Sequence, residues 1–215
     1  MDSTSHDELV KLIARQVAEK LRDYNQFKIP VGVSNRHVHV SREDLDILYG
    51  KGYELTKKGD LKQPGQFASN ETVTIRGPKG EFNKVRILGP IRKESQVEIS
   101  KTDSFRLGIR PPIRESGCLE GTPGLEVIGP KGTVVMPQGA IIALRHIHMT
   151  PEQAQAMGVK DKDIVEVETF GERHGVFGDV LIRVSDKFSL EMHVDVDEAN
   201  ACALSNNDYV VIRRP

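Results

Sequence analysis

A short histidine motif that occurs twice is the feature that most constrains the fold of this chain. Residues 36–41 read RHVHVS and residues 145–150 read RHIHMT, so both copies follow the pattern Arg-His-apolar-His-apolar-Ser/Thr. Alternate side chains of a β-strand point to the same side, so each copy should place its histidines on one face and its apolar residues on the other. The repetition predicts two similar β-rich lobes.

A second, weaker match extends the repeat. Residues 97–108 (VEISKTDSFRLG) align with residues 192–203 (MHVDVDEANACA), and each segment reads as a strand that ends in an acidic residue and opens a helical turn. In this alignment Glu98 falls opposite His193. The two matches together suggest an internal duplication, with the lobes divided around residues 109–125.

Turn residues divide much of the remaining chain into short strands. The sequence GPKG occurs at residues 77–80 and again at residues 129–132, and each copy predicts the turn of a β-hairpin. We interpret both as plain hairpin turns rather than as cradles for a phosphate group. Ser41 and Thr150 are predicted to cap short helices. Further strands are predicted near residues 164–169, 176–184, 190–194 and 209–213.

The first 28 residues differ from the rest of the chain. Apolar residues recur there at steps of three and four, which predicts an amphipathic helix. The residues of this stripe are Leu9, Leu12, Ile13, Val17 and Leu21. One interpretation is a helix that packs on the body of the protein or on a second subunit of a homodimer. The other is an address peptide that a partner surface recognises.

Composition limits the classes of partner. The chain has 30 basic and 31 acidic residues, so it lacks the basic excess of a nucleic-acid-binding protein. No apolar run is long enough to cross a bilayer, and the polar start lacks the apolar core of a secretory signal. The two cysteines are too few for a disulfide framework. A cytoplasmic protein with no nucleic-acid or membrane partner is therefore expected.

The paired histidines indicate a metal site. Two imidazoles on one strand face lie roughly 7 Å apart, which suits one metal ion or two neighbouring ions. Glu98 and His193 are the equivalent residues of the following strands, so facing lobes would offer six ligands with positions left open for substrate. Imidazole combined with carboxylate favours zinc. The candidate ligands are His37, His39, Glu98, His146, His148 and His193.

Arg92 is the candidate anion-binding residue. It follows a Gly-Pro turn and precedes the strand that carries Glu98. A guanidinium group grips phosphate with two parallel hydrogen bonds. Cys118 and Cys202 have neither the C-x-x-C spacing of a zinc knot nor a histidine partner visible in the sequence, so a cysteine nucleophile is not expected.

Four segments carry a resemblance to a known family. SNRHVHVS, GPIRKESQVEIS, LRHIHMT and LEMHVDVDEANACAL resemble the PduL-type phosphate acyltransferases, also called phosphate propanoyltransferases, in residue order and spacing. The resemblance implies a mainly β fold with short helices, built from two pseudo-repeated closed β-barrel domains. In this chain the barrels are expected at residues 29–115 and 116–215, after an N-terminal extension of residues 1–28. Exchange of strands between the lobes is compatible with these boundaries.

The resemblance also implies an activity. Enzymes of this family move a short acyl group, propanoyl or acetyl, reversibly between coenzyme A and inorganic phosphate, and their site holds two zinc ions. The family's metal ligands fall on the six candidate ligands, and its phosphate-binding arginine falls on Arg92. Direct attack of phosphate on the thioester is expected, without an acyl-enzyme. Some relatives enter a bacterial microcompartment through an amphipathic N-terminal peptide, so shell or core proteins of a microcompartment are candidate partners of the N-terminal helix.

Two other interpretations use the same residues. A dinuclear zinc hydrolase would use the ligands to activate water, and it would release the coenzyme A thiol without phosphate. A non-catalytic zinc-binding β-barrel protein would bind zinc without affinity for coenzyme A.

Overall fold

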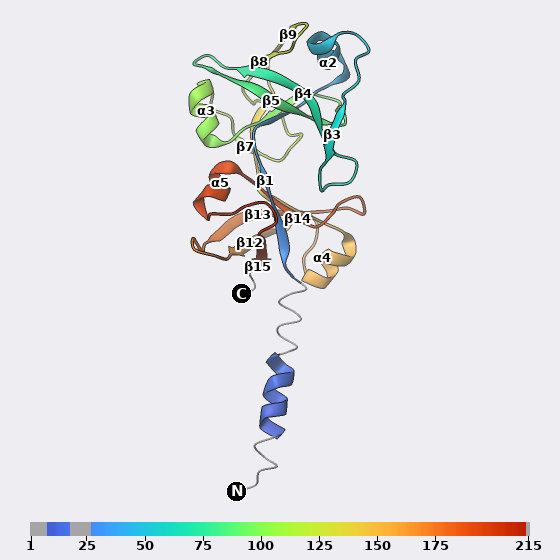
Figure 1. The fold of residues 1–215 in the computed structure, drawn as a ribbon. Helices are drawn as coiled ribbons and strands as arrows, with labels where there is room; N and C mark the ends of the chain where they lie inside the picture. Colours follow the sequence, from blue (N-terminus) through green and yellow to red (C-terminus); the bar gives the residue numbers. More distant parts are fainter. Residues whose placement is uncertain (1–7, 18–26, 214–215) are drawn as a thin grey trace.

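The computed structural model describes residues 8–17 and 27–213. Two β-rich lobes lie one above the other in Figure 1, and short helices flank both. Residues 8–17 form a helix at the N-terminal end. Leu9, Leu12 and Ile13 on this helix are each about half exposed. Leu21, the last residue of the predicted stripe, lies outside the described residues.

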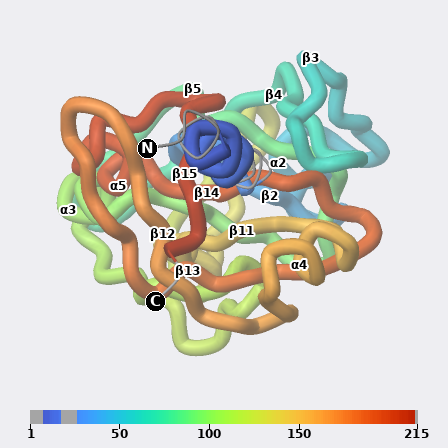
Figure 2. The backbone as a smooth tube through the Cα atoms, turned by 90° about the horizontal axis from the view of Figure 1, so that it is seen from below, coloured from blue at the N-terminus to red at the C-terminus, as the bar shows by residue number. Residues whose placement is uncertain are grey.

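The lower lobe is a closed barrel of six strands in the order β1-β14-β11-β13-β12-β15. Figure 2 shows α4 (Pro151–Met157) and α5 (Val196–Ala201) on different sides of it. The strands are β1 (Ile29–Ser34), β11 (His146–Met149), β12 (Ile164–Thr169), β13 (Val176–Val184), β14 (Glu191–Asp195) and β15 (Tyr209–Ile212). The barrel core includes Ile147, Met149 and Met192. The apolar residues of the second motif are therefore buried, as predicted.

The upper lobe is an open sheet in the order β7-β10-β6-β2-β5-β4-β8-β9, with β3 paired to β4. Its strands are β2 (His37–His39), β3 (Lys57–Asp60), β4 (Phe67–Arg76), β5 (Glu81–Gly89), β6 (Gln96–Glu98), β7 (Ile113–Arg114), β8 (Leu125–Ile128), β9 (Thr133–Met136) and β10 (Ala140–Ala143). Val38 and Val40 of the first motif are buried in its core.

Only one of the two predicted barrels is closed by strand pairing. In the described residues the upper sheet ends at β7 and β9, which do not pair with each other. The edge strand β7 has only two residues and follows Pro111 and Pro112. Proline has no backbone N–H to donate to a neighbouring strand, so this edge offers little for closing the sheet.

Both sheets take strands from the two halves of the chain. β1 precedes the first histidine motif, yet it pairs with β14 and β15 of the barrel. β8 and β10 come after residue 115, yet they pair with β4 and β6 of the upper sheet. This is the exchange of strands that the predicted boundaries allowed for, and the boundaries themselves stay a prediction.

Short helices follow the histidine strands in both lobes. Ser41 caps α2 (Arg42–Tyr49) by accepting a hydrogen bond from the Asp44 N–H. Thr150 caps α4 (Pro151–Met157) in the same way, with Pro151 in the first turn. The predicted caps are confirmed. The remaining helices are α3 (Lys101–Leu107) and α5 (Val196–Ala201). Within the described residues, no helix has the length and hydrophobicity needed to span a bilayer.

The two GPKG turns are hairpin turns that pack on helix ends. Lys79 N–H donates to the Leu107 carbonyl at 3.1 Å, and Lys131 N–H donates to the Leu48 carbonyl at 3.0 Å. These amide groups are occupied within the fold. The interpretation as plain turns rather than phosphate cradles agrees with this arrangement.

Replacing Gly77 with alanine is expected to destabilise the protein. A Cβ atom at this position would lie 2.2 Å from the backbone oxygen of Leu107, which cannot rotate away. Overpacking of this kind costs about 1–3 kcal/mol in the free energy of unfolding. Urea unfolding measures the loss. Gly59→Ala is the control, because a Cβ atom there meets no atom within 4 Å; equal unfolding free energies for the two variants would contradict the prediction.

Candidate functional site

The histidine motifs lie in equivalent places in the two sheets. In the upper sheet β2 pairs antiparallel with β6, and His37 lies opposite Glu98. In the barrel β11 pairs antiparallel with β14, and His146 lies opposite His193. These registers agree with the alignment of Glu98 with His193. The tertiary structure therefore places both halves of the repeat in the same local geometry.

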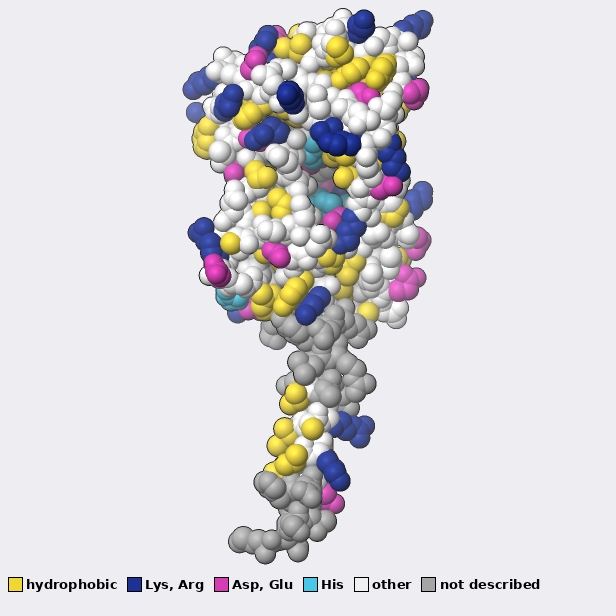
Figure 3. Space-filling model, in the orientation of Figure 1, with side chains coloured by type: hydrophobic (Ala, Val, Ile, Leu, Met, Phe, Trp, Pro, Cys, Tyr) yellow, Lys and Arg dark blue, Asp and Glu magenta, His cyan; other side chains and the backbone are white. Residues whose placement is uncertain are grey.

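The six candidate ligands form two clusters that line one cleft. Each cluster brings one ligand atom from each of its three residues to within 4.8 Å of the others. The clusters are His37, His39 and Glu98 in the upper lobe, and His146, His148 and His193 in the barrel. The cleft has a volume of about 530 Å³ and is lined by residues of both lobes. Figure 3 shows histidine side chains in the hollow where the lobes meet.

Two residues of the upper cluster, His39 and Glu98, have the protonation states that metal binding requires. The Nδ1 atom of His37 lies 2.8 Å from the Asn35 carbonyl oxygen, and its Nε2 atom lies 3.4 Å from Glu98 Oε2. Burial, with a further effect of His37, lowers the pKa of His39 to about 3. Burial acts to raise the pKa of Glu98, but His37, His39, the Ser116 hydroxyl and Arg92 together hold that pKa at about 2. Neutral imidazole and ionised carboxylate are the ligand forms.

In the barrel cluster, His146 and His148 are neutral as well. His146 Nδ1 lies 2.8 Å from the Leu144 carbonyl oxygen, which matches the contact of His37. Burial and neighbouring histidines lower the pKa of His146 to about 4 and that of His148 to about 2. The His148 ring stacks on Phe188 with centroids 4.1 Å apart, and in the described part of the chain neither of its buried nitrogens has a hydrogen-bond partner. A metal ion would satisfy one of them.

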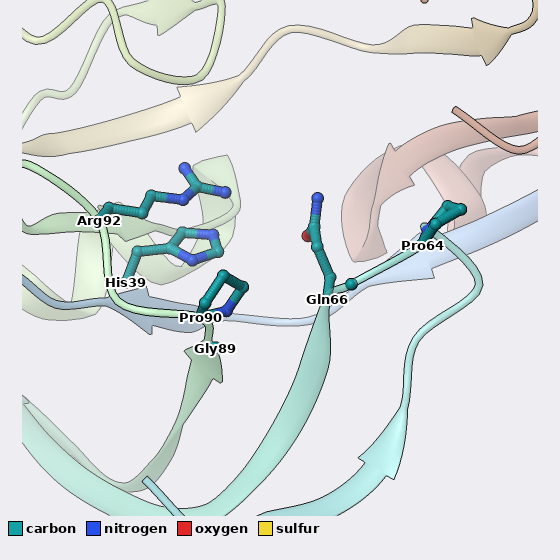
Figure 4. A pocket seen from close by; sticks show the side chains of 7 residues that line it. His39, Pro64, Gln66, Gly89, Pro90 and Arg92 are labelled. Atoms are coloured by element: carbon teal, nitrogen blue, oxygen red, sulfur yellow. The ribbon is translucent and has the colours of Figure 1, made fainter. Parts of the chain in front are cut away.

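Arg92 is linked to the upper cluster through a serine. Its Nη1 atom donates to Ser116 Oγ at 3.0 Å, and this hydroxyl donates to Glu98 Oε1 at 3.0 Å. Gln96 Nε2 donates to the same Ser116 oxygen at 2.8 Å. In Figure 4 the Arg92 guanidinium lies beside the His39 ring. The sequence-predicted anion-binding residue and the upper cluster therefore line the same cleft.

A smaller pocket adjoins the cleft at Arg92. It has a volume of about 260 Å³. Pro64, Gln66 and Pro90 line it together with His39 and Arg92, as Figure 4 shows. Apart from His39 and Arg92, the residues that line it are uncharged.

The cleft lining includes polar residues that the sequence reasoning missed, among them Arg183, Glu191 and Gln63. Arg183 lies opposite His148 in the pairing of β11 with β13, and no local motif marks it. Glu191 precedes His193 by two residues in β14, so strand alternation was a signal that could have identified it. Gln63 lies in the turn between β3 and β4, where a short polar segment reads as an ordinary loop.

The chain is similar to known proteins over most of its length. A family model described as phosphate propanoyltransferase matches residues 30–205, which include both clusters and Arg92. The chain belongs to the phosphate propanoyltransferase family. Relatives that carry this name are acyltransferases, as expected from the resemblance.

Several relatives match across nearly the full chain. A phosphate propanoyltransferase of Thermotoga maritima is 58% identical over 207 residues, which are 94% of this chain and 99% of the relative. One of Rhodopseudomonas palustris is 56% identical over 86% of this chain and 82% of its own length. One of Rhodobacter capsulatus is 54% identical over 96% and 95%. The similarity therefore covers both lobes.

Proposed function

We propose that the protein transfers a short acyl group, propanoyl or acetyl, reversibly between coenzyme A and inorganic phosphate, with two zinc ions in its site. The observation that carries this proposal is that two clusters of metal-binding type and Arg92 line a single cleft. Membership of the phosphate propanoyltransferase family supports the same reaction class. It favours an enzyme over a non-catalytic zinc-binding protein.

The residues present fit zinc. His37, His39 and Glu98 would hold one ion, and His146, His148 and His193 would hold the other. Three protein ligands for each ion leave a coordination position for substrate, as in catalytic zinc sites. Bound zinc would supply Lewis-acid polarisation of the thioester carbonyl and a partner for the soft sulfur of the leaving group.

The protein's own residues position the reactants. A phosphate oxygen forms a bond to the thioester carbonyl carbon, and the carbon–sulfur bond breaks with its electron pair left on the coenzyme A sulfur. Arg92 would bind and orient the incoming phosphate, while Ser116 holds the guanidinium in place. The smaller pocket beside Arg92 would receive the acyl chain.

This displacement needs no protein nucleophile. Cys118 is exposed, and Cys202 is buried in the barrel core. Neither cysteine is among the residues that line the cleft. The reaction is therefore proposed to proceed in a ternary complex of enzyme, acyl-CoA and phosphate, without an acyl-enzyme.

Release of the coenzyme A thiol from propanoyl-CoA and from acetyl-CoA is expected to depend on added phosphate. Phosphate is the attacking group, so the rate should rise with its concentration and acyl phosphate should form in equal amount. A thiol-reactive dye follows the release, and hydroxylamine trapping measures the acyl phosphate. Thiol release at the full rate without phosphate would contradict the proposal and favour the zinc hydrolase.

The control for the nucleophile is the double variant Cys118→Ala and Cys202→Ala. It should keep most of the turnover in the same assay, because neither thiol takes part in the reaction. Near-total loss of turnover in a folded double variant would indicate an acyl-enzyme instead.

The helix at residues 8–17 is proposed to be a docking element. Leu9, Leu12, Ile13 and Val17 are about half exposed on it, and Figure 3 shows apolar side chains gathered on one side. A microcompartment shell or core protein is one partner that would cover this face, and a second copy of the chain in a homodimer is the other. The first would place the enzyme in the cytoplasm inside a bacterial microcompartment.

A further inference from the structure

The internal repeat identifies the residue of the upper lobe that is equivalent to Glu191. In the upper sheet Gln96 lies opposite His39, and in the barrel Glu191 lies opposite His148. Gln96 and Glu191 are therefore equivalent, just as Glu98 and His193 are. The carboxylate and the neutral residue have exchanged places between the lobes.

This exchange leaves one carboxylate in each half of the site. The upper cluster contains its own carboxylate, Glu98, whereas the barrel cluster consists of three histidines. Three imidazole ligands bring no negative charge to a divalent cation. Glu191 is the carboxylate that the structure places beside them.

The surroundings of Glu191 are those of a buried group that lacks a strong cationic partner. The residue is 7% exposed. Its Oε2 atom lies 3.1 Å from His193 Nε2, and across the described residues no Lys or Arg side chain comes within ion-pair distance of it. A buried carboxylate without a cation is costly. A divalent cation held by the neighbouring histidines would offset this cost.

The fold also holds the carboxylate in place from two other elements. Gln63 Nε2, from the upper lobe, donates to Glu191 Oε2 at 3.1 Å and to the Ser189 carbonyl at 3.0 Å. On the other side lies Gly32 of β1, where an added Cβ atom would be 2.7 Å from Glu191 Oε1. The absence of a side chain at Gly32 leaves room for the carboxylate.

We infer that Glu191 is a positioning residue for the barrel cluster: it fixes His193 and supplies the negative charge that His146, His148 and His193 lack, and so raises their affinity for a divalent cation. It acts through His193, because the group of ligand atoms within 4.8 Å of one another comprises the three histidines without Glu191. This inference rests on the proposed metal-dependent function. Loss of a carboxylate partner of a metal-binding histidine lowers metal affinity about 10- to 100-fold.

The test measures zinc content of the full-length protein without reference to turnover. Zinc-loaded protein is dialysed against a series of chelator-buffered zinc concentrations, and zinc per chain is measured by mass spectrometry. The wild type is expected to hold two ions. Glu191→Gln should keep one of them unchanged and need about 10- to 100-fold more free zinc to retain the other.

Glu168→Gln is the matched control. Glu168 Oε1 lies 2.8 Å from His174 Nε2, so this variant also removes a carboxylate beside an imidazole, but neither residue lines the cleft. Both zinc ions of this variant should be as tightly held as in the wild type. A weakening equal to that of Glu191→Gln would overturn the inference, because it would reflect a general loss of charge.

Gly32→Ala provides a second variant that keeps the charge and displaces it. The added methyl group would push on Glu191 Oε1, so zinc at the same single site should bind more weakly. Thermal melting shows whether each variant is folded. If folded Glu191→Gln holds both zinc ions as tightly as the wild type does, the inference is overturned and the proposed function is left intact. A wild type that binds no zinc would overturn both.

Discussion

Replacing Glu98 with glutamine is expected to remove one zinc ion and most of the activity. The substitution keeps the shape of the side chain but removes the only carboxylate of the upper cluster, whose oxygens lie 3.4 Å from His37 Nε2 and 3.9 Å from His39 Nε2. Metal-ion catalysis contributes several kcal/mol to transition-state stabilisation, so phosphate-dependent turnover should fall roughly a hundredfold or more. Zinc analysis and the thiol-release assay measure the two effects together.

The control for this substitution is Glu94→Gln. Glu94 is exposed on the segment that leads into the same strand, so its replacement removes the same charge without touching the cluster. Zinc content and turnover should both be unchanged in this variant. Full turnover by Glu98→Gln in protein verified to have lost that zinc ion would show that the upper cluster is not needed for the reaction.

Replacing Arg92 with alanine is expected to weaken the use of phosphate more than that of acyl-CoA. The guanidinium lines the cleft beside His39, and burial lowers its pKa while leaving it available as a cation for an incoming anion. Loss of one group that stabilises developing charge typically costs about 10²- to 10³-fold in rate. Turnover measured at varied phosphate concentration should therefore show a higher KM for phosphate and a lower kcat.

The variant Arg92→Lys separates the effect of the positive charge from that of the guanidinium geometry. Arg92→Lys keeps a positive charge but loses the two parallel donors and the bond to Ser116, so its activity should lie between those of wild type and Arg92→Ala. Arg173→Lys is the control, because Arg173 is exposed and lies away from the cleft. An unchanged KM for phosphate in Arg92→Ala would assign phosphate binding to another residue.

Local sequence was sufficient to predict many individual elements. Strand alternation predicted that the apolar residues of both histidine motifs are buried, and Val38 and Ile147 confirm it. The caps at Ser41 and Thr150 and both GPKG hairpins were predicted because their causes lie within a few residues of one another. A helix at the N-terminal end was predicted for the same reason, and residues 8–17 form one, while its amphipathic role stays a prediction.

Local sequence could not predict how these elements are arranged in space. Only the tertiary structure shows that β1 pairs with β14 and β15, that the upper sheet stays open, and that Arg183 lies opposite His148. Gln63 reaches the strand that carries Glu191 across 128 positions of sequence. A local pattern records which face of a strand is buried. The register between distant strands depends instead on how whole sheets pack, so the sequence determined the ligand types and the fold decided which of them meet.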